Sequence, residues 1–202
     1  MSKTPRVGSG PVNRVRESHS NRFAILAVCT ANICRSPLME LLLRQQLDTS
    51  VYEIGSAGVR GFTDYPMDAG AAKQALRFGA DPQYFTSRPI TADLIKSSGL
   101  ILTATREHRS SVLAATPSAL RRTFTLVEFA QLCEDYPAAS VTELIAGAAR
   151  HRSQVSGSID ISDPFRQGEL VHQHVAEQIL TGVRKISVAL SEFAEADGAV
   201  TD

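Results

Sequence analysis

The sequence predicts an α/β fold: a single-domain, three-layer sandwich in which helices cover both faces of a four-stranded parallel sheet. Residues 23–28 form an apolar run without polar alternation, which indicates a strand covered on both faces. Short runs of this kind alternate with helical patterns along the chain, as is typical of parallel sheets. With 202 residues, of which 43% are hydrophobic, the chain is long enough to bury one sizeable core.

The first strand is expected to turn directly into a helix. Pro37 suits the first position of a helix, and the leucines at 38, 41 and 42 repeat at helical spacing. Residues 29–36 must therefore connect the end of a strand to the N-terminus of a helix. Backbone N–H groups point outward at such a turn and the helix dipole favours negative charge, so a phosphate group is the natural occupant.

Strands and helices are expected to alternate through the next part of the chain. Residues 52–56 are a short strand, and residues 67–78 are a helix that Gly79 ends. The apolar residues 100–103 form a third strand that begins directly after Gly99.

The second half of the chain is predicted to complete the sheet and its helical cover. A helix over 106–115 stops near Pro117, and a fourth strand follows at 124–127. An additional helix is expected at 140–151. The last helix has the clearest pattern, because its apolar residues recur at helical spacing: Val171, Val175, Ile179, Val183, Ile186, Leu190 and Phe193.

Cys29 and Arg35 stand at the two ends of the first turn. A cysteine beside a helix N-terminus and an arginine favours the thiolate form, which is the nucleophilic form. Arg35 offers a planar, bidentate donor for two phosphate oxygens, and Ser36 can donate a hydrogen bond to the sulfur. The Cys-x5-Arg spacing alone is weak, since about 0.3 accidental matches are expected in a chain of this composition. The preceding strand and the following Pro37 make coincidence less probable.

The run from Val28 to Pro37 resembles the phosphate-binding loop of bacterial-type low-molecular-weight protein tyrosine phosphatases, usually V-C-x-G-N-x-C-R-S-P. Three later segments resemble the same family in the same order: Gly55-Ser56-Ala57-Gly58, Pro66-Met67-Asp68 and Asp163-Pro164-Phe165. The resemblance covers about residues 22–195, the expected phosphatase domain, and leaves tails at 1–21 and 196–202.

This resemblance implies a phosphotyrosine protein phosphatase that hydrolyses its substrate in two steps. Cys29 takes the phosphoryl group as a phosphocysteine, while Asp163 protonates the leaving phenolate and then activates water. Arg35 and the loop amides hold the phosphoryl oxygens. No metal or other cofactor is expected, because the arginine and the amides supply the positive field.

The resemblance also implies the supporting residues. Ser56 supports the loop, and Phe62 and Phe165 sandwich the substrate ring. The phosphate-binding loop comprises, besides the catalytic pair, Thr30, Ala31, Asn32, Ile33, Cys34 and Ser36. Cys34 is either a redox partner that forms a disulfide with Cys29 or a small buried residue, and both remain open.

The sequence departs from the family pattern in several places. Ala31 replaces the usual glycine, which would strain the loop if this position needs positive φ. Phe85 stands where many members have a histidine, so the hydrogen-bond network through Asn32, Ser36 and Ser56 is in question. The connection at 137–158 is longer than usual.

Three alternative functions remain open. An arsenate reductase would need a relay of further thiols, but only Cys133 is spare and it is expected in the core. Phosphoarginine phosphatases have threonine where this chain has Ile33, whose apolar side chain suits an aromatic ring better. A non-catalytic phosphopeptide-binding module is disfavoured because Cys29, Arg35 and Asp163 are all present.

Composition limits the partners and the location. The formal net charge is zero, so nothing draws the chain toward nucleic acid or acidic membranes. Three cysteines do not suggest a secreted disulfide framework, and no apolar run approaches the length of a membrane span. We therefore expect a cytoplasmic protein with a tyrosine-phosphorylated protein as substrate, a bacterial tyrosine kinase being one candidate, and phosphate or a similar oxyanion in the loop.

Three basic positions are expected to have no part in function. His108 lies between arginines in a helical pattern and is predicted to be at the surface. The pair Arg121-Arg122 is predicted to be a solvated turn and not a binding patch.

Overall fold

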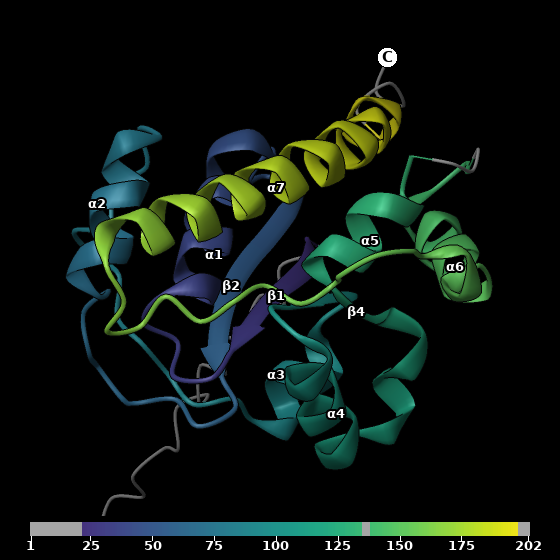
Figure 1. The fold of residues 1–202 in the computed structure, drawn as a ribbon. Coiled ribbons are helices and arrows are strands. Elements are labelled where there is room, and N and C mark those ends of the chain that lie inside the picture. The colour runs from purple at the N-terminus through teal and green to yellow at the C-terminus, as the bar shows by residue number, and fades with distance from the viewer. Residues whose placement is uncertain (1–21, 135–137, 198–202) are drawn as a thin grey trace, which may run out of the picture.

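The structure, a computed structural model, describes residues 22–134 and 138–197 (Figure 1). Four parallel strands form one sheet in the order β2-β1-β3-β4. Their bounds are β1 (Phe23–Cys29), β2 (Tyr52–Gly58), β3 (Leu100–Thr103) and β4 (Thr123–Thr125). The predicted fold class is confirmed. The predicted tail at 1–21 lies outside the described residues, as do residues 198–202.

Helices cover both faces of the sheet, as Figure 1 shows. One face carries α1 (Arg35–Gln46), α2 (Ala69–Arg77), α5 (Leu126–Leu132) and α7 (Glu169–Asp197). The opposite face carries α3 (Ala92–Ser97), α4 (Arg106–Ala115) and the 3-10 helix η1 (Pro117–Arg122). A further helix, α6 (Val141–Arg150), packs beside η1, and a short 3-10 turn, η2 (Arg152–Gln154), follows it.

Strand β1 divides the core into two parts because its side chains alternate between the faces. Ile25 and Cys29 belong to the larger cluster under α1 and α7, whereas Leu26 and Val28 belong to the smaller cluster under α3 and α4. Every residue from Ile25 to Cys29 is buried. The apolar run without alternation is thus explained by packing on both sides, and it anchors the strand that ends at the cysteine.

The start of one helix differs from the sequence prediction, and two short α-helices were not predicted. Helix α1 begins at Arg35, two residues before Pro37, so the proline lies within the first turn, where no intrahelical N–H bond is lost. Helix α5 begins at Leu126, where the fourth strand was expected to continue, because Thr125 and Glu128 form a capping box. Helix α3, capped by the Thr91 side chain, is only six residues long and gave no clear period.

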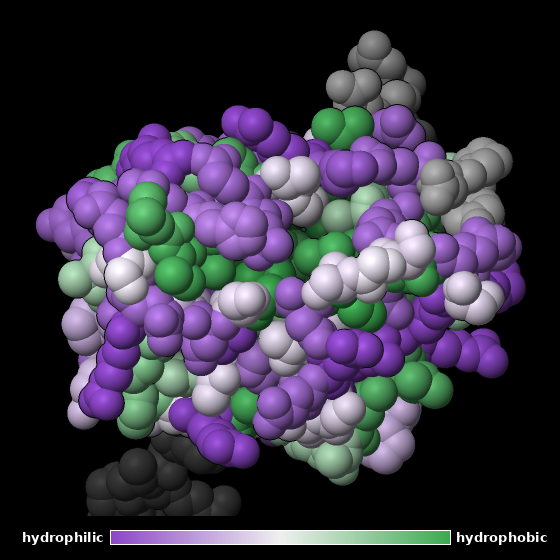
Figure 2. Space-filling view, in the orientation of Figure 1, coloured by the Kyte–Doolittle hydropathy of each residue, from purple (hydrophilic) through white to green (hydrophobic). Residues whose placement is uncertain are grey.

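Helix α7 closes the larger face of the sheet. It packs against α1, α2 and α5, and Tyr52 of β2 donates its hydroxyl to the carbonyl of Leu190 at 2.8 Å. Figure 2 shows this side of the molecule, on which hydrophilic residues dominate and hydrophobic ones form small groups. None of the helices within residues 22–134 and 138–197 has the length and hydropathy required to cross a bilayer.

Candidate active site

The loop between Cys29 and Arg35 turns its backbone carbonyls outward. The carbonyls accept hydrogen bonds from neighbouring segments: Cys29 from Val59 N, Thr30 from Arg60 N, Ala31 from Phe62 N, Ile33 from Asp68 N and Cys34 from Leu38 N. By contrast, no backbone N–H of residues 30–35 donates to an acceptor on another described residue. A row of free N–H groups at the start of a helix is an anion-binding cradle.

Asn32 sets the shape of this cradle. Its φ of 59° lies in the left-handed region, which asparagine tolerates better than most residues. The strain expected at Ala31 is therefore absent, because positive φ falls one residue later. The Asn32 amide donates to Ser36 Oγ at 2.9 Å and to Ser56 Oγ at 2.8 Å, and its oxygen accepts from Arg88 N at 2.9 Å.

The hydrogen-bond network through Asn32, Ser36 and Ser56 forms in this chain, although Phe85 stands where many family members have a histidine. Ser56 Oγ donates to Glu40 Oε2 at 2.5 Å, and the other Glu40 oxygen pairs with Arg44 at 2.9 Å. Arg88 Nε donates to the Ser56 carbonyl at 2.8 Å, while Phe85 packs against the core. Sequence reasoning missed Glu40, although its place on α1, one turn beyond Ser36, was a usable signal.

Cys29 is buried at the carboxyl end of β1, with its Sγ 3.0 Å from Ser36 Oγ. The Ser36 hydroxyl already accepts a hydrogen bond from Asn32, so its proton is available for the sulfur. The only other acceptor in reach among the described residues, the Ala57 carbonyl, is farther away at 3.4 Å. A hydroxyl donor on the sulfur stabilises a thiolate, both before attack and when the sulfur later departs.

Arg35 lies at the first turn of α1 and is only 4% exposed. One terminal nitrogen donates to the Ile161 carbonyl at 3.0 Å, and the other contacts Thr30 Oγ1 at 3.3 Å and Asp163 Oδ2 at 2.9 Å. Its Nε is buried and has no hydrogen-bond partner among the described residues. The guanidinium is thus fixed beside the cradle with one N–H still to be satisfied, which suits an oxyanion.

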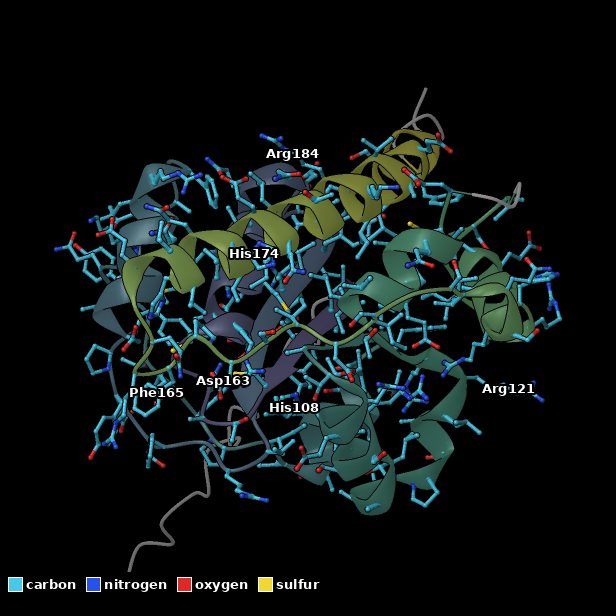
Figure 3. The ribbon with its side chains drawn as sticks, in the orientation of Figure 1. His108, Arg121, Asp163, Phe165, His174 and Arg184 are labelled. Atoms are coloured by element: carbon cyan, nitrogen blue, oxygen red, sulfur yellow. The ribbon has the colours of Figure 1, made fainter. Side chains whose placement is uncertain are left out.

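Asp163 meets Arg35 from the segment that leads into α7. Its side chain is 52% exposed, and its second oxygen accepts from Phe165 N at 3.2 Å. Figure 3 shows Asp163 near His108, at the end of the sheet where β1 stops. The structure therefore brings together the three residues predicted to be catalytic, although they come from two distant parts of the chain.

The segment before Asp163 is clamped to the rest of the domain. Ile161 N donates to the Ala104 carbonyl at 2.9 Å, and Asp160 accepts from Arg106 N at 2.7 Å, Nε at 3.0 Å and Nη2 at 2.8 Å. Partial burial raises the pKa of Asp160, but the hydrogen bonds from Arg106 outweigh it, so the net shift is downward. This two-sided attachment positions the carboxylate three residues later.

His108 is buried beside the cradle, so the prediction of a surface position is wrong. Its Nε2 lies 2.8 Å from Thr30 Oγ1 and its Nδ1 lies 2.8 Å from Thr105 Oγ1. Burial, aided by the positive charge of Arg35, lowers the pKa of His108 to about 4, so the ring is neutral at physiological pH. The neighbouring arginines suggested that this part of the helix is exposed. However, Thr105 caps α4, and the helix that begins there turns His108 toward the interior.

The described cysteines are all free thiols. Cys34 is buried as the N-cap residue of α1; burial raises its pKa, and the negative charge of Asp68 adds to the shift. A buried, protonated thiol fits the alternative in which Cys34 is a small buried residue. Its redox role stays a prediction. Cys133 is 4% exposed in the main core, as expected.

The predicted aromatic contacts lie on exposed loops. Phe62 is 48% exposed and packs against Tyr65, with ring centroids 5.0 Å apart. Its backbone N–H bonds the Ala31 carbonyl, which places Phe62 directly beside the cradle. Phe165 is 41% exposed, two residues after Asp163. No cluster of three or more metal-ligating side chains occurs within the described residues.

A parallel sheet that presents a cysteine, an arginine and free amides at its carboxyl edge is the arrangement expected of a cysteine-dependent phosphatase. A family model described as low molecular weight phosphotyrosine protein phosphatase matches residues 24–136, more than half of the chain. The chain belongs to this family. The predicted family is confirmed.

Curated relatives carry the same family name. Etp of Escherichia coli, a low molecular weight protein-tyrosine-phosphatase, is 40% identical over 100 residues, which are 50% of this chain and 66% of Etp. The probable phosphatase EpsP of Ralstonia solanacearum is 34% identical over 113 residues, 56% of this chain and 77% of EpsP. The chain thus matches about two thirds to three quarters of the length of these relatives.

Solved structures extend the likeness beyond residue 136. The tyrosine phosphatase AmsI of Erwinia amylovora has a TM-score of 0.66 at 24% identity and covers 87% of this chain, with 97% of AmsI covered. The arginine phosphatase YwlE of Geobacillus stearothermophilus has a TM-score of 0.68 at 24% identity and covers 89% of this chain, with 99% of YwlE covered. At this identity the likeness shows the fold alone, and the fold is common to both substrate classes.

Proposed function

We propose that this chain is a phosphotyrosine protein phosphatase in which Cys29 is the nucleophile and Asp163 the general acid and base. The observation that carries the proposal is the arrangement around the loop. Three features lie in and beside this one loop: a sulfur hydrogen-bonded to a serine hydroxyl, a buried arginine whose Nε has no partner among the described residues, and backbone N–H groups that donate to none of them.

In the first step the sulfur of Cys29 attacks phosphorus, forming the S–P bond as the bond from phosphorus to the phenolic oxygen breaks. Asp163 gives its proton to the departing oxygen. Arg35 and the amides hold the three equatorial oxygens, where the transition-state charge lies. Because Arg35 contacts Asp163 at 2.9 Å, the ion pair must open for the phosphoryl group to take its place on the guanidinium.

In the second step water hydrolyses the phosphocysteine. Asp163, now a carboxylate, accepts a proton from the attacking water, and the S–P bond breaks. The Ser36 hydroxyl, 3.0 Å from Sγ, stabilises the thiolate that leaves. The enzyme returns to its starting state, with inorganic phosphate in the cradle.

An aromatic phosphate ester is the substrate class that the surroundings favour. Ile33 presents a branched apolar side chain that packs against the core beside the loop, and Phe62 and Phe165 offer exposed rings for stacking. An apolar wall gives no hydrogen-bond acceptor for the guanidinium of phosphoarginine. A phosphotyrosine-bearing protein, a tyrosine kinase being one candidate, is the proposed partner.

The proposed location is the cytoplasm. Three free thiols, one of them the nucleophile, support a reducing environment, in which the attacking sulfur stays reduced.

The test of the mechanism is the substitution Cys29→Ser. We expect it to abolish hydrolysis of p-nitrophenyl phosphate and of a phosphotyrosine peptide, while inorganic phosphate still binds through Arg35 and the amides. Turnover is measured by release of phosphate, and binding by calorimetry. Cys133→Ser is the matched control and should retain full activity, because that thiol lies in the core. Undiminished turnover by Cys29→Ser would rule the mechanism out.

Substrate preference is tested in the same assay with phosphotyrosine, phosphoserine and phosphoarginine peptides of one sequence. The proposal expects kcat/KM to be highest for phosphotyrosine. A higher kcat/KM for phosphoarginine would overturn the assignment of substrate while leaving the role of Cys29 intact.

A further inference from the structure

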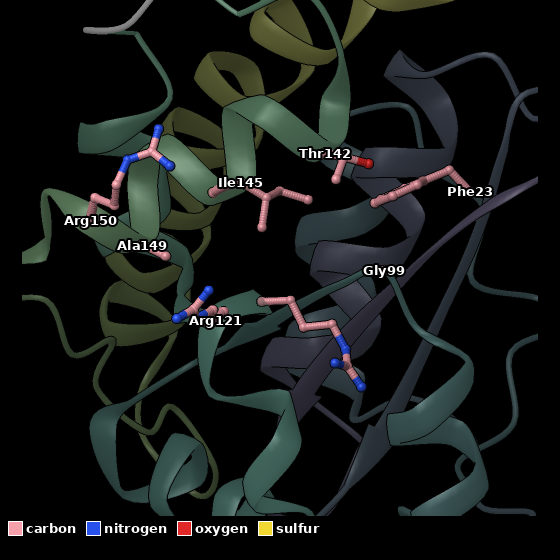
Figure 4. Close-up of a pocket in the computed structure, with 9 residues that line it drawn as sticks. Phe23, Gly99, Arg121, Thr142, Ile145, Ala149 and Arg150 are labelled. Carbon is pink, nitrogen blue, oxygen red and sulfur yellow. The ribbon is translucent and has the colours of Figure 1, made fainter.

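A groove of about 590 Å³ opens at the amino ends of β1 and β3, at the opposite edge of the sheet from Cys29. Its walls come from α6, from η1 and from the first residue of β1 (Figure 4). The seven residues of β1 separate it from the cradle by about 20 Å. The volume lies in the range of small-molecule sites, about 300–1,000 Å³.

The apolar part of the groove is preformed. Ile145 and Ala149 lie four residues apart on one face of α6 and line one side, and Phe23 lines the other (Figure 4). The Phe23 ring stands edge-on to Tyr52, with centroids 6.3 Å apart, and lies against Gly99. A Cβ at Gly99 would come within 2.4 Å of that ring. The ring is therefore held in place without any ligand.

The charged part of the groove is cationic. Arg121, Arg122 and Arg150 line it beside the neutral Thr142, and none of the lining residues is acidic. Arg122 is half-buried; its terminal nitrogens donate to the neutral carbonyls of Ser118 and Ile95, and its Nε is buried without a partner. The prediction of a solvated turn at 121–122 is thus wrong for Arg122. Its charge has no counterion within the described residues.

The positive charge of the three lining arginines is a local feature of the groove. The whole chain has a formal net charge of zero, yet the lining carries three positive charges and no negative one. A bound anion would complement this positive charge.

We propose that the groove binds a small organic anion in which one acidic group is attached to an apolar body about the size of naphthalene. The acidic group pairs with Arg121 and Arg150, whose planar guanidinium groups suit carboxylate or phosphate oxygens. The apolar body packs between Ile145, Ala149 and Phe23. Helix α6 lies beyond residue 136, where the match to the family model ends.

The test uses 2-naphthoate as the probe and the full chain with ¹³C-labelled isoleucine methyl groups. Titration should shift the Ile145 methyl resonance to saturation and give a dissociation constant. The neutral analogue 2-naphthamide should bind at least about tenfold more weakly, because it cannot form the charged pair. The double substitution Arg121→Gln with Arg150→Gln should weaken naphthoate binding by at least about tenfold.

Two controls separate the groove from other sites. Arg184→Gln removes an exposed arginine on α7 and should leave the affinity unchanged. Arg35→Ala disables the phosphate cradle and should also leave naphthoate binding at Ile145 unchanged, so that failure here and failure of the phosphatase mechanism are distinguishable. The proposal is overturned if millimolar naphthoate leaves Ile145 unshifted, if naphthamide binds equally well, or if either control variant weakens binding as much as the double variant.

Discussion

At position 32 an asparagine adopts left-handed backbone and uses its side-chain amide to fix two serines and the neighbouring Arg88 N–H. The sequence motif identified Asn32, Cys29 and Arg35 because each is needed as a particular residue type. It could not identify Glu40 or His108, since a glutamate on a helix and a histidine between arginines are ordinary surface residues in sequence. Only the tertiary contacts give them a place in the site.

Asp163→Ala is predicted to slow the first step according to the leaving group. A phenol of high pKa needs the proton that Asp163 supplies, whereas p-nitrophenolate departs readily without it, so the loss in kcat should be about tenfold to a hundredfold larger for phenyl phosphate. Rates across a series of aryl phosphates measure the effect. Equal losses for all leaving groups would remove Asp163 as proton donor.

His108 is predicted to make stability depend on pH. In the unfolded chain His108 becomes protonated below its ordinary pKa of 6.5. In the folded chain its pKa is about 4, so the ring stays neutral until the pH is that low. The free energy of unfolding should therefore fall as pH drops through this window, by up to about 3 kcal/mol. Urea unfolding between pH 4 and 7 measures it. His108→Gln should flatten the dependence, and His174→Gln, at an exposed site on α7, should not.

At the level of elements, the spacing of apolar residues and the positions of turn residues predicted most of the helices and strands. Strand β3 and helix α4 were predicted with their observed bounds, because Gly99, Pro117 and continuous apolar runs mark their ends. Helix α5 was not predicted, because a capping box at Thr125 overrides the strand preference of the residues around it. Whether such a short helix forms depends on a few hydrogen bonds at its cap. Its sequence is too short to show a clear helical spacing of apolar residues.

The segment 160–163 is an element without regular structure whose position is nonetheless fixed. Asp160→Asn should weaken its attachment to Arg106, displace Asp163 and reduce kcat by about tenfold. The inhibition constant of inorganic phosphate should not change, because the cradle itself is intact. Steady-state kinetics on an aryl phosphate measure both. Asp93→Asn, at an exposed position on α3, is the control; an unchanged kcat for Asp160→Asn would show that the clamp does not position Asp163.

For the whole molecule, the order of strands places the cysteine of β1 at the centre of the sheet, between β2 and β3. The sequence predicted four parallel strands with helices on both faces, because strands and helices alternate along the chain, but it did not predict the order of the strands. It did not predict the buried ion pairs that connect the elements of the second half of the chain. These ion pairs centre on Glu128, which is 3% exposed and pairs with Arg109 at 2.8 Å and Arg152 at 3.7 Å.

Glu128→Gln is predicted to destabilise the whole domain and spare catalysis. The substitution leaves two partly buried guanidinium groups from α4 and the 152–154 turn without their carboxylate, at a cost of about 3 kcal/mol. The free energy of unfolding in urea should fall by that amount, while kcat/KM at low temperature stays within about twofold. Glu107→Gln, exposed on α4, should change neither quantity. A loss of activity without a loss of stability would contradict this structural role.

The contact between Arg35 and Asp163 has a consequence for the end of the catalytic cycle. A carboxylate attached to the same chain competes with free phosphate for one guanidinium, at an effective concentration on the order of millimolar. We therefore expect Asp163 to help displace the product and to limit inhibition by accumulating phosphate. Replacing that aspartate should consequently make inorganic phosphate a stronger inhibitor.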